Sequence, residues 1–188
     1  MEQKIELGTE YEDLTSLVYR QMRLSIDELT PEQEKKYTEE LKLNPLKAKI
    51  YEASDKDIEA LVNLYNKSWL TSNTPFRSIE AKTLMSLHHN PEIIILIAKY
   101  HGIPAGFIIL DFEGAKNHYG SILALGILPR FQHRGLGRFL ALNAWEYFKQ
   151  RDIKELRSEV YVDNTVSNKF NQALGFKEID VKTYTNDI

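Results

Sequence analysis

Residues 129–138 read PRFQHRGLGR, and this stretch decides the fold. It contains three arginines, one histidine and two glycines but no acidic residue. A β-rich run precedes it at residues 121–127, and a helical pattern follows over residues 135–150. Glycine lets the backbone approach a ligand closely, and the first turn of a helix presents free N–H groups and the positive end of its dipole. The stretch therefore predicts a phosphate-binding site at a strand-to-helix junction, although each glycine alone would equally serve a tight turn.

The glycine spacing separates this site from two common nucleotide-binding motifs. A P-loop requires GxxxxGK[ST], which does not occur in the sequence. A dinucleotide-binding fingerprint requires a third glycine where Leu140 stands, and its glycines directly follow the strand, whereas residues 129–134 intervene here. The pattern therefore disfavours a Rossmann-type nucleotide-dependent enzyme.

The rest of the chain predicts a mixed α/β fold. Strands are expected at residues 48–53, 92–100, 105–112, 121–127, 155–161 and 176–184, and helices from Ser54, from Ser78, over 135–150 and over 165–174. The second and third strands form a hairpin, because a short turn containing Gly102 and Pro104 separates them. This order predicts a mixed, largely antiparallel sheet, neither doubly wound nor a sandwich.

The first 46 residues are predicted to form two helices. Apolar residues spaced by four indicate one amphipathic helix, with Leu14, Val18, Met22 and Ile26 on its apolar face. A capping box at residues 30–33 starts the second, which ends by residues 44–45. We therefore expect a helical N-terminal extension, residues 1–46, docked on a domain formed by residues 47–188; the alternative is a frayed tail.

Composition excludes several functional classes. The 188 residues include 24 Lys and Arg against 27 Asp and Glu, and a net charge of -3 disfavours nucleic acid as a partner. Without cysteine there is no disulfide, zinc–cysteine site or thiol nucleophile. The five histidines show no metal-binding spacing, so no metal is predicted. The polar, acidic opening residues and the shortness of the longest apolar run, EIIILIA, predict a soluble cytoplasmic protein without a membrane partner.

Two motifs resemble those of the GCN5-related N-acetyltransferases (GNAT). Residues 132–137, QHRGLG, match the family's Q/R-x-x-G-x-G/A motif, with its apolar-x-Pro lead-in at residues 127–129. Residues 159–176, which run from EVYVDN through Asn168 to Gly175-Phe176, are similar to the family's strand-Asn-helix-Gly-Phe element. Residues 50–58 also look like its first strand and helix. The resemblance covers residues 48–176 and implies a GNAT-like acyl-CoA N-acyltransferase fold, with acetyl-CoA between two splayed parallel strands, 121–127 and 155–161.

The resemblance also implies which residues hold acetyl-CoA. Backbone groups of Leu125, Gly126 and Ile127 would bind the pantetheine arm as another strand would. Backbone amides would hold the pyrophosphate without a metal, those of His133, Arg134, Gly135, Leu136, Gly137 and Arg138. Asn164 matches the family's cofactor-contacting asparagine. Independently, Asn164, Asn168 and Asn171 share one face of the predicted helix and offer amides to a ligand, although a solvated polar face is the alternative.

The catalytic assignment is Glu159 as the base. It stands where the family members that acetylate peptide N-termini carry their proton acceptor; the alternative is a strand-end carboxylate paired with Arg157 or Lys154. The family's usual acid, a tyrosine four residues before Gly175, is replaced by Asn171, which has no transferable proton. Tyr161 is a weak substitute, and Ser167 is another.

The function implied is an acetyl-CoA-dependent N-acetyltransferase that moves an acetyl group directly to a primary amine, of a small molecule or of a peptide. The alternative is a catalytically weak or silent acetyl-CoA-binding or interaction module. Only twelve residues follow Phe176, whereas the family usually continues through two strands that wall the acceptor site. We therefore expect a pocket that is open or completed by the N-terminal extension or by a second subunit, as in a homodimer. Candidate wall residues are Trp69, Phe76 and Arg77.

Overall fold

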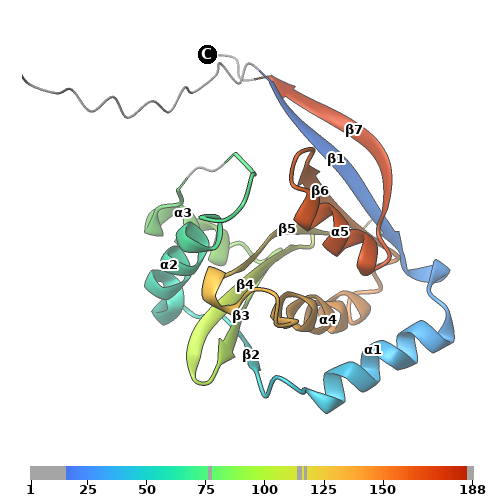
Figure 1. Cartoon of the computed structure of the whole chain (residues 1–188), viewed down its shortest axis with the longest axis horizontal. Coiled ribbons are helices and arrows are strands. Elements are labelled where there is room, and N and C mark those ends of the chain that lie inside the picture. Colours follow the sequence, from blue (N-terminus) through green and yellow to red (C-terminus); the bar gives the residue numbers. More distant parts are fainter. Residues whose placement is uncertain (1–15, 76–77, 114–115, 117, 186–188) are drawn as a thin grey trace, which may run out of the picture.

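The computed structural model describes residues 16–75, 78–113, 116 and 118–185. Its centre is one seven-stranded sheet with the order β2-β3-β4-β5-β6-β1-β7 (Figure 1). The strands are β1 (Ser16–Ser25), β2 (Lys49–Glu52), β3 (Ile93–Tyr100), β4 (Ile103–Asp111), β5 (Tyr119–Ile127), β6 (Glu155–Tyr161) and β7 (Lys177–Thr185). Only the pairing of β5 with β6 is parallel among these strands. The predicted mixed, largely antiparallel sheet is therefore confirmed.

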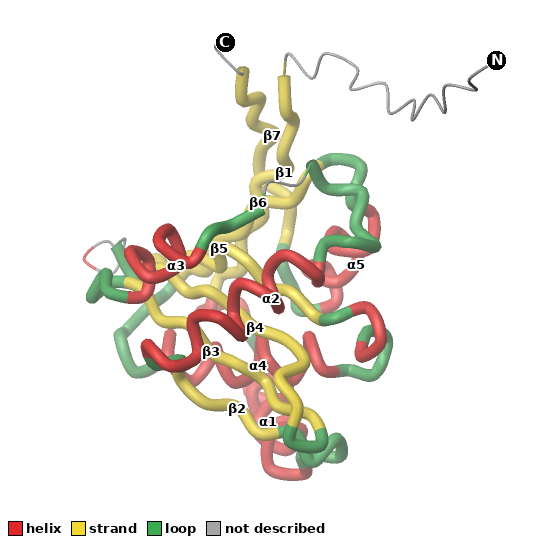
Figure 2. The backbone as a smooth tube through the Cα atoms, turned by 90° about the vertical axis from the view of Figure 1, so that its left-hand side faces the viewer, coloured by secondary structure: helices red, strands yellow, loops and turns green. Residues whose placement is uncertain are grey.

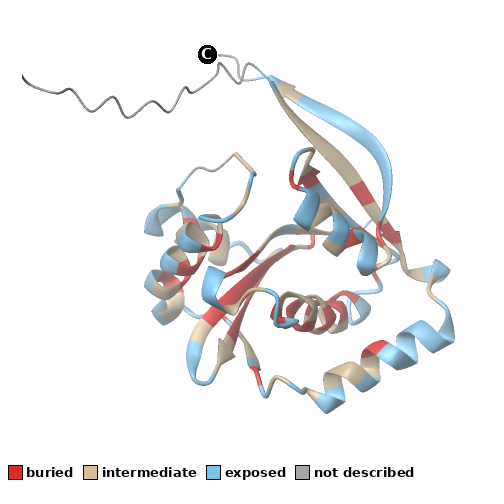
Figure 3. Ribbon diagram, in the orientation of Figure 1, coloured by how far each residue is buried: buried red, intermediate tan, exposed pale blue. Residues whose placement is uncertain are grey.

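Helices cover both faces of this sheet (Figure 2). They are α1 (Pro31–Leu43), α2 (Ile58–Ser68), α3 (Ala81–His88), α4 (Leu136–Lys149) and α5 (Thr165–Ala173). One hydrophobic cluster joins the sheet to α2 and α3, and a larger one joins its other face to α4 and α5. Strands β3 and β4 lie between the two clusters and are the most deeply buried (Figure 3). No helix in the described part of the chain is long and apolar enough to cross a membrane.

The first predicted helix is wrong, because residues 16–25 form strand β1. Val18 and Met22 lie on one side of a helix or of a strand alike, because a spacing of four residues is also even. Burial of both Met22 and Leu24 shows the strand period. Residues 16–25 form a strand and not a helix because they pair antiparallel with the edges of both β6 and β7. Leu14 lies outside the described residues.

The second predicted helix is confirmed as α1. Thr30 and Gln33 form the expected capping box: Thr30 Oγ1 accepts from the Gln33 N–H at 3.2 Å, and Gln33 Oε1 accepts from the Thr30 N–H at 2.8 Å. The helix docks on α4 through Arg138, whose Nε and Nη2 donate to Glu40 at 2.7 and 3.1 Å. In its described residues, 16–46, the N-terminal extension thus contains one strand and one docked helix. The predicted domain boundary after residue 46 stays a prediction, and β1 joins the two parts in a single sheet.

Strand β1 also completes the sheet beyond β6. The short segment after Phe176 provides one strand, β7, at the sheet edge. Strand β1 lies between β6 and β7, so the N-terminal segment provides the second of the two strands expected here (Figure 1). One of the predicted alternatives, completion by the N-terminal extension, therefore describes this wall.

Candidate functional site

The two parallel strands separate halfway along their length. Their pairing runs from Tyr119 opposite Glu155 to Ile122 opposite Ser158 and ends there. On the other side of β5, Ile122 and Ala124 pair with consecutive residues of β4, so Leu123 is an extra residue in the ladder, a β-bulge. The bulge turns β5 away from β6, and a pocket of about 340 Å³ lies at the split.

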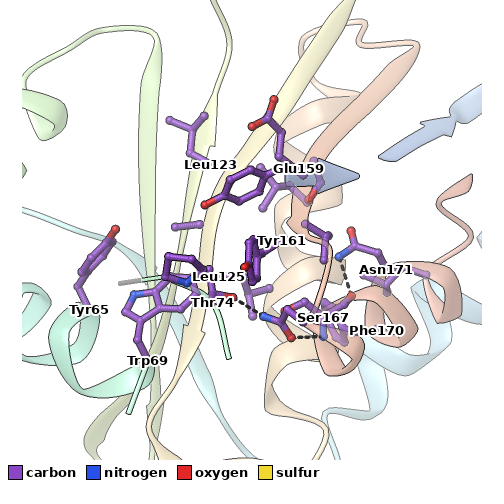
Figure 4. A pocket seen from close by; sticks show the side chains of 18 residues that line it. Tyr65, Trp69, Thr74, Leu123, Leu125, Glu159, Tyr161, Ser167, Phe170 and Asn171 are labelled. Atoms are coloured by element: carbon purple, nitrogen blue, oxygen red, sulfur yellow. Dashed lines mark hydrogen bonds between the residues drawn. The ribbon is translucent and has the colours of Figure 1, made fainter. Parts of the chain in front are cut away.

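The pocket is lined by β1, β5, β6, α2, the loop after α2, and α5 (Figure 4). The side chains of Phe170 and Asn171 lie on the α5 side, and those of Tyr65 and Trp69 lie on the α2 side. The predicted wedge between splayed strands is therefore present. It is lined by side chains from both sides of the split, so a donor and an acceptor could meet between the strands.

The glycine-containing loop leads from β5 into α4 in the way the sequence predicted. Gly135 precedes the helix with φ +84°, in the left-handed region that favours glycine, and no atom lies within 4 Å of a Cβ built there. His133, Arg134 and Gly135 are exposed. Because the first N–H groups of an α-helix have no partner within the helix, those of Leu136, Gly137 and Arg138 face this open loop. The geometry fits an anion such as a pyrophosphate.

The arginine side chains of this loop do not all remain available. The Arg138 guanidinium binds Glu40 and lies over the Tyr37 ring, which raises the pKa of Arg138 through its hydrogen bond to the Glu40 carboxylate. Gln132 turns back to β5, and its Nε2 donates to the Ile127 carbonyl at 2.9 Å. The site can therefore use the backbone amide of Arg138 but not its side chain, and Gln132 holds the loop against the end of β5.

The three residues predicted to bind the pantetheine arm differ in position. Leu125 lines the pocket, whereas Gly126 and Ile127 do not. A Cβ at Gly126 would collide with the side chains of Phe107 and Ser68, so this glycine allows α2 to pack closely on the sheet. Backbone contacts from Gly126 and Ile127 to a cofactor stay a prediction.

Asn164 joins α5 to the loop after α2. Its Oδ1 caps α5 by accepting from the Ser167 N–H at 2.9 Å, while its Nδ2 donates to Thr74 Oγ1 at 2.7 Å and Ser72 Oγ at 3.2 Å. The side chain is buried and lines the pocket. A contact from its amide to a cofactor would exchange one of these bonds.

The other two asparagines of α5 differ from each other. Asn171 is buried, lines the pocket and donates from Nδ2 to the Ser167 carbonyl at 2.9 Å. Asn168 is not among the pocket residues, and its Oδ1 is buried without a partner in the structure. The predicted amide face therefore reaches the pocket at Asn164 and Asn171.

Glu159 is exposed at the pocket wall and binds a residue that the sequence did not indicate. Tyr184 Oη donates to Glu159 Oε1 at 2.7 Å, and partial burial raises the pKa of Tyr184, with this hydrogen bond as the second cause. The alternative ion pairs are not those expected: Arg157 binds Glu155 at 2.7 Å and Lys154 binds Asp152 at 3.1 Å. Glu159 is thus free of both basic residues that the alternative assigned to it.

Tyr161, the weak candidate acid, lines the same pocket next to Tyr19 of β1. Their ring centroids lie 5.6 Å apart in an edge-to-face arrangement. Partial burial raises the pKa of Tyr161, and the nearby Asp163 carboxylate raises it further. The phenol therefore keeps its proton across the neutral range. Ser167, the other substitute, also lines the pocket.

Trp69 lines the pocket, as predicted for the acceptor wall, and packs edge-to-face on Tyr65 at 5.9 Å. Phe76 and Arg77 lie outside the described residues.

Tyr19 and Tyr184 were not predicted from the sequence, because neither stands in a motif or a local pattern that points to the site. They come from opposite ends of the chain and meet only when β1 enters the sheet, where their ring centroids are 5.7 Å apart.

A group of potential metal ligands lies away from the pocket. Although His88 and His89 are adjacent at the end of α3, both of their Nε2 atoms reach Asp55 Oδ1, at 3.3 and 2.9 Å. Ligand atoms of the three residues lie within 4.8 Å of one another. None of the three lines the pocket, so this group takes no part in the site.

Comparisons with known proteins agree with this geometry. The family model described as the Acetyltransferase (GNAT) family matches residues 58–176. The chain is 31% identical over 85 residues to a mycothiol acetyltransferase of Renibacterium salmoninarum, a match covering 45% of this chain and 22% of that protein. It is 26% identical over 146 residues to a spermidine N(1)-acetyltransferase of Thermoplasma acidophilum, covering 70% and 89%.

The fold is similar to that of PaiA N-acetyltransferase from Thermoplasma acidophilum, which was solved in complex with coenzyme A. The TM-score is 0.64 at 23% identity, over 73% of this chain and 98% of that one.

Proposed function

This chain belongs to the Acetyltransferase (GNAT) family, and from that premise we propose that it moves the acetyl group of acetyl-CoA directly to a primary amine. It is an N-acetyltransferase by family, and acetyl-CoA is its cosubstrate. One observation supports the direct transfer most strongly. The pocket at the split of β5 and β6 has Glu159 on its wall. The same strand β5 leads through the exposed loop at Gly135 to the free backbone N–H groups at the start of α4.

The residues present suit the cosubstrate. The N–H groups at the start of α4 would hold the pyrophosphate, and β5 around Leu125 would bind the pantetheine arm. Acetyl-CoA supplies an activated thioester. Arg138, bound to Glu40, holds α1 against α4 and so steadies the first turn of the helix that carries these amides.

Glu159 would remove the proton that the amine loses. An amine with a pKa of about 10.4 is mostly protonated at pH 7, so a base must accept that proton directly or through water. The nitrogen then bonds to the carbonyl carbon, the carbon–sulfur bond breaks, and the departing thiolate takes a proton to give CoA. Tyr161 is the candidate donor of that proton, since its phenol stays protonated beside Asp163.

A catalytically weak or silent acetyl-CoA-binding module remains the second proposal, and Asn171 favours it. This side chain occupies the position of the family's acid, and its Nδ2 donates a hydrogen bond to the Ser167 carbonyl. The N-terminal extension and a second subunit were the two alternatives for completing the wall; β1 provides it here, so we do not propose a homodimer. A cytoplasmic location stays a prediction from the sequence.

Binding and turnover distinguish the two proposals. At about 100 times its Kd, acetyl-CoA should stabilise the protein by about 2.7 kcal/mol and raise Tm by ~5–10 °C, whereas NAD should not. CoA release should then follow addition of a suitable amine. Binding without release for any amine, at neutral or alkaline pH, would support the silent module.

The base is tested by Glu159→Gln, with Glu155→Gln on the same strand as the matched control. Loss of a general base should lower kcat about 10²- to 10⁴-fold, most strongly at low pH. Glu155 binds Arg157 away from the pocket, so its variant should keep the wild-type rate. Equal rates in both variants would show that Glu159 is not the base.

A further inference from the structure

We propose that the acceptor is a primary amine with a single positive charge on a flat or apolar body, and not a polycation such as a polyamine or an aminoglycoside. This inference rests on the proposed function and names its substrate class. The evidence is a group of side chains that we call the aromatic cup: Tyr19, Tyr65, Trp69, Glu159 and Tyr161, which line the pocket, and Tyr184, which contacts Tyr19 and Glu159 from outside the lining. Figure 4 labels Tyr65, Trp69, Glu159 and Tyr161.

Strand register places the cup on one face of the sheet. Leu156 and Val160 of β6 pack into the core on the α4 side, so Glu159 and Tyr161 point to the opposite face. Tyr19 pairs directly with Tyr161 and lies on that face too. The face is the one covered by α2, which brings Tyr65 and Trp69 from the other side of the split.

The cup offers ring surface around one carboxylate. The ring centroid of Tyr19 lies 5.7 Å from that of Tyr184 and 5.6 Å from that of Tyr161. The Tyr184 hydroxyl donates a hydrogen bond to Glu159. Aromatic faces attract cations within about 6 Å and also bind flat apolar groups. Leu123, 51% exposed at the β5 bulge, adds apolar surface to the same pocket. An ammonium beside Glu159 would therefore have rings and apolar carbon around the rest of its molecule.

The charges near the cup match one ammonium group. Among the eighteen described residues that line the pocket, Glu159 alone carries a carboxylate. Asp163 lies near Tyr161, and Lys182 lies opposite Tyr19 with its Nζ 4.6 Å from the Tyr184 ring centroid. Two acidic groups and one basic group leave a balance of one negative charge. A polyamine or an aminoglycoside would bring more positive charge than this balance of one negative charge matches, and would bring it close to Lys182.

Space favours the same class of acceptor. The pocket of about 340 Å³ must hold the reacting end of acetyl-CoA as well as the amine. Pockets for whole drug-sized ligands begin at about 300 Å³. A small amine with one ring fits beside the thioester, whereas an aminoglycoside of several sugar rings would have to lie mostly outside the cup.

The test is CoA release from acetyl-CoA with four amines: phenethylamine, butylamine, spermidine and kanamycin. Phenethylamine should have the highest kcat/KM, about tenfold above butylamine, because packing of its ring on one or two aromatic side chains corresponds to about that factor.

Variants of Tyr19 connect the preference to the cup. Tyr19→Leu should raise KM for phenethylamine about tenfold and should reduce the preference of the protein for phenethylamine over butylamine. Tyr19→Phe keeps the ring and should restore most of the affinity. A matching Tm in both variants shows that β1 is still in place.

Each remaining outcome decides against the inference. Higher kcat/KM for spermidine or kanamycin than for phenethylamine would overturn the substrate class while leaving the acetyltransferase proposal standing, and so would equal KM values in Tyr19→Leu and Tyr19→Phe. Binding of acetyl-CoA with no release of CoA for any amine would overturn the proposed function and this inference with it.

Discussion

Replacing Leu24 by alanine tests the placement of β1 directly. In the strand, Leu24 is 7% exposed and packs in the main hydrophobic cluster, where its Cδ1 lies 3.3 Å from the position of a Cβ at Gly175. Removing such a buried leucine side chain typically costs 2–5 kcal/mol, about 3 kcal/mol as a central value. In the helix that the apolar spacing predicts, Leu24 lies off the apolar face, and the same change would cost about 0.5 kcal/mol or less.

The measurement is the free energy of unfolding from urea denaturation, supported by Tm. For a chain of this size, 1 kcal/mol corresponds to about 2–4 °C, so Leu24→Ala should lower Tm by roughly 6–12 °C. Arg23→Ala is the neighbouring control. Its guanidinium is exposed and forms long ion pairs of 3.9 and 3.6 Å to Glu28 and Glu155, contacts worth about 1 kcal/mol at most. A Leu24→Ala variant as stable as Arg23→Ala would refute the strand.

Three further predictions concern the cofactor, the acid and alkaline pH. Gly135→Asp or Gly137→Asp should abolish CoA binding in calorimetry while circular dichroism stays native, because the new carboxylate repels the pyrophosphate; near-native affinity in both would make the glycines ordinary turn residues. Asn171→Tyr should raise kcat at neutral pH, with a gain that shrinks as pH rises; an unchanged or lower rate with intact CoA affinity would mean that another acid already serves. Burial raises the pKa of Tyr51 from 10.0 to about 12, with its hydrogen bond to Asp57 as the second cause, so the stability it contributes is present below pH 10 and lost as pH rises through about 12. Between pH 10 and pH 12, the urea midpoint of Tyr51→Phe should therefore fall less than that of the wild type. An equal fall in both proteins would contradict this.

Some parts of the site are formed by residues close together in the sequence, and others by residues far apart in it. The loop before α4 and the cap of α5 depend on residues within a few positions of one another, whereas the acceptor wall joins both ends of the chain. The cup depends on Glu159 from β6, Tyr19 from β1 and Tyr184 from β7, so a change that displaces β1 should reduce activity and stability together. The Leu24→Ala variant should for this reason also show a raised KM for the amine.

Sequence alone determined the features that neighbouring residues specify. The glycines at 135 and 137 predicted the loop and the start of α4, Thr30 and Gln33 predicted the start of α1, and the two GNAT motifs predicted the split parallel strands. The loop and the two helix starts depend on backbone conformation and capping within a few residues, so the local residues contain the necessary information, whereas the split strands were implied by the family resemblance. The assignment of Glu159 as the base also came from the resemblance, through its position within a motif, and it stays a prediction.

Only the tertiary structure decided whether residues 16–25 form a helix or a strand, and which residues form the acceptor wall. The apolar spacing at Val18 and Met22 suits a helix and a strand equally, and the choice depends on whether the open edges of β6 and β7 are available to pair with it. Those partners are more than 130 residues away in the chain, as the pairing of Arg20 with Val160 and Val181 shows. The hydrogen bond from Tyr184 to Glu159 and the packing of Tyr19 between Tyr161 and Tyr184 follow from that pairing, because strand register determines which side chains share a face.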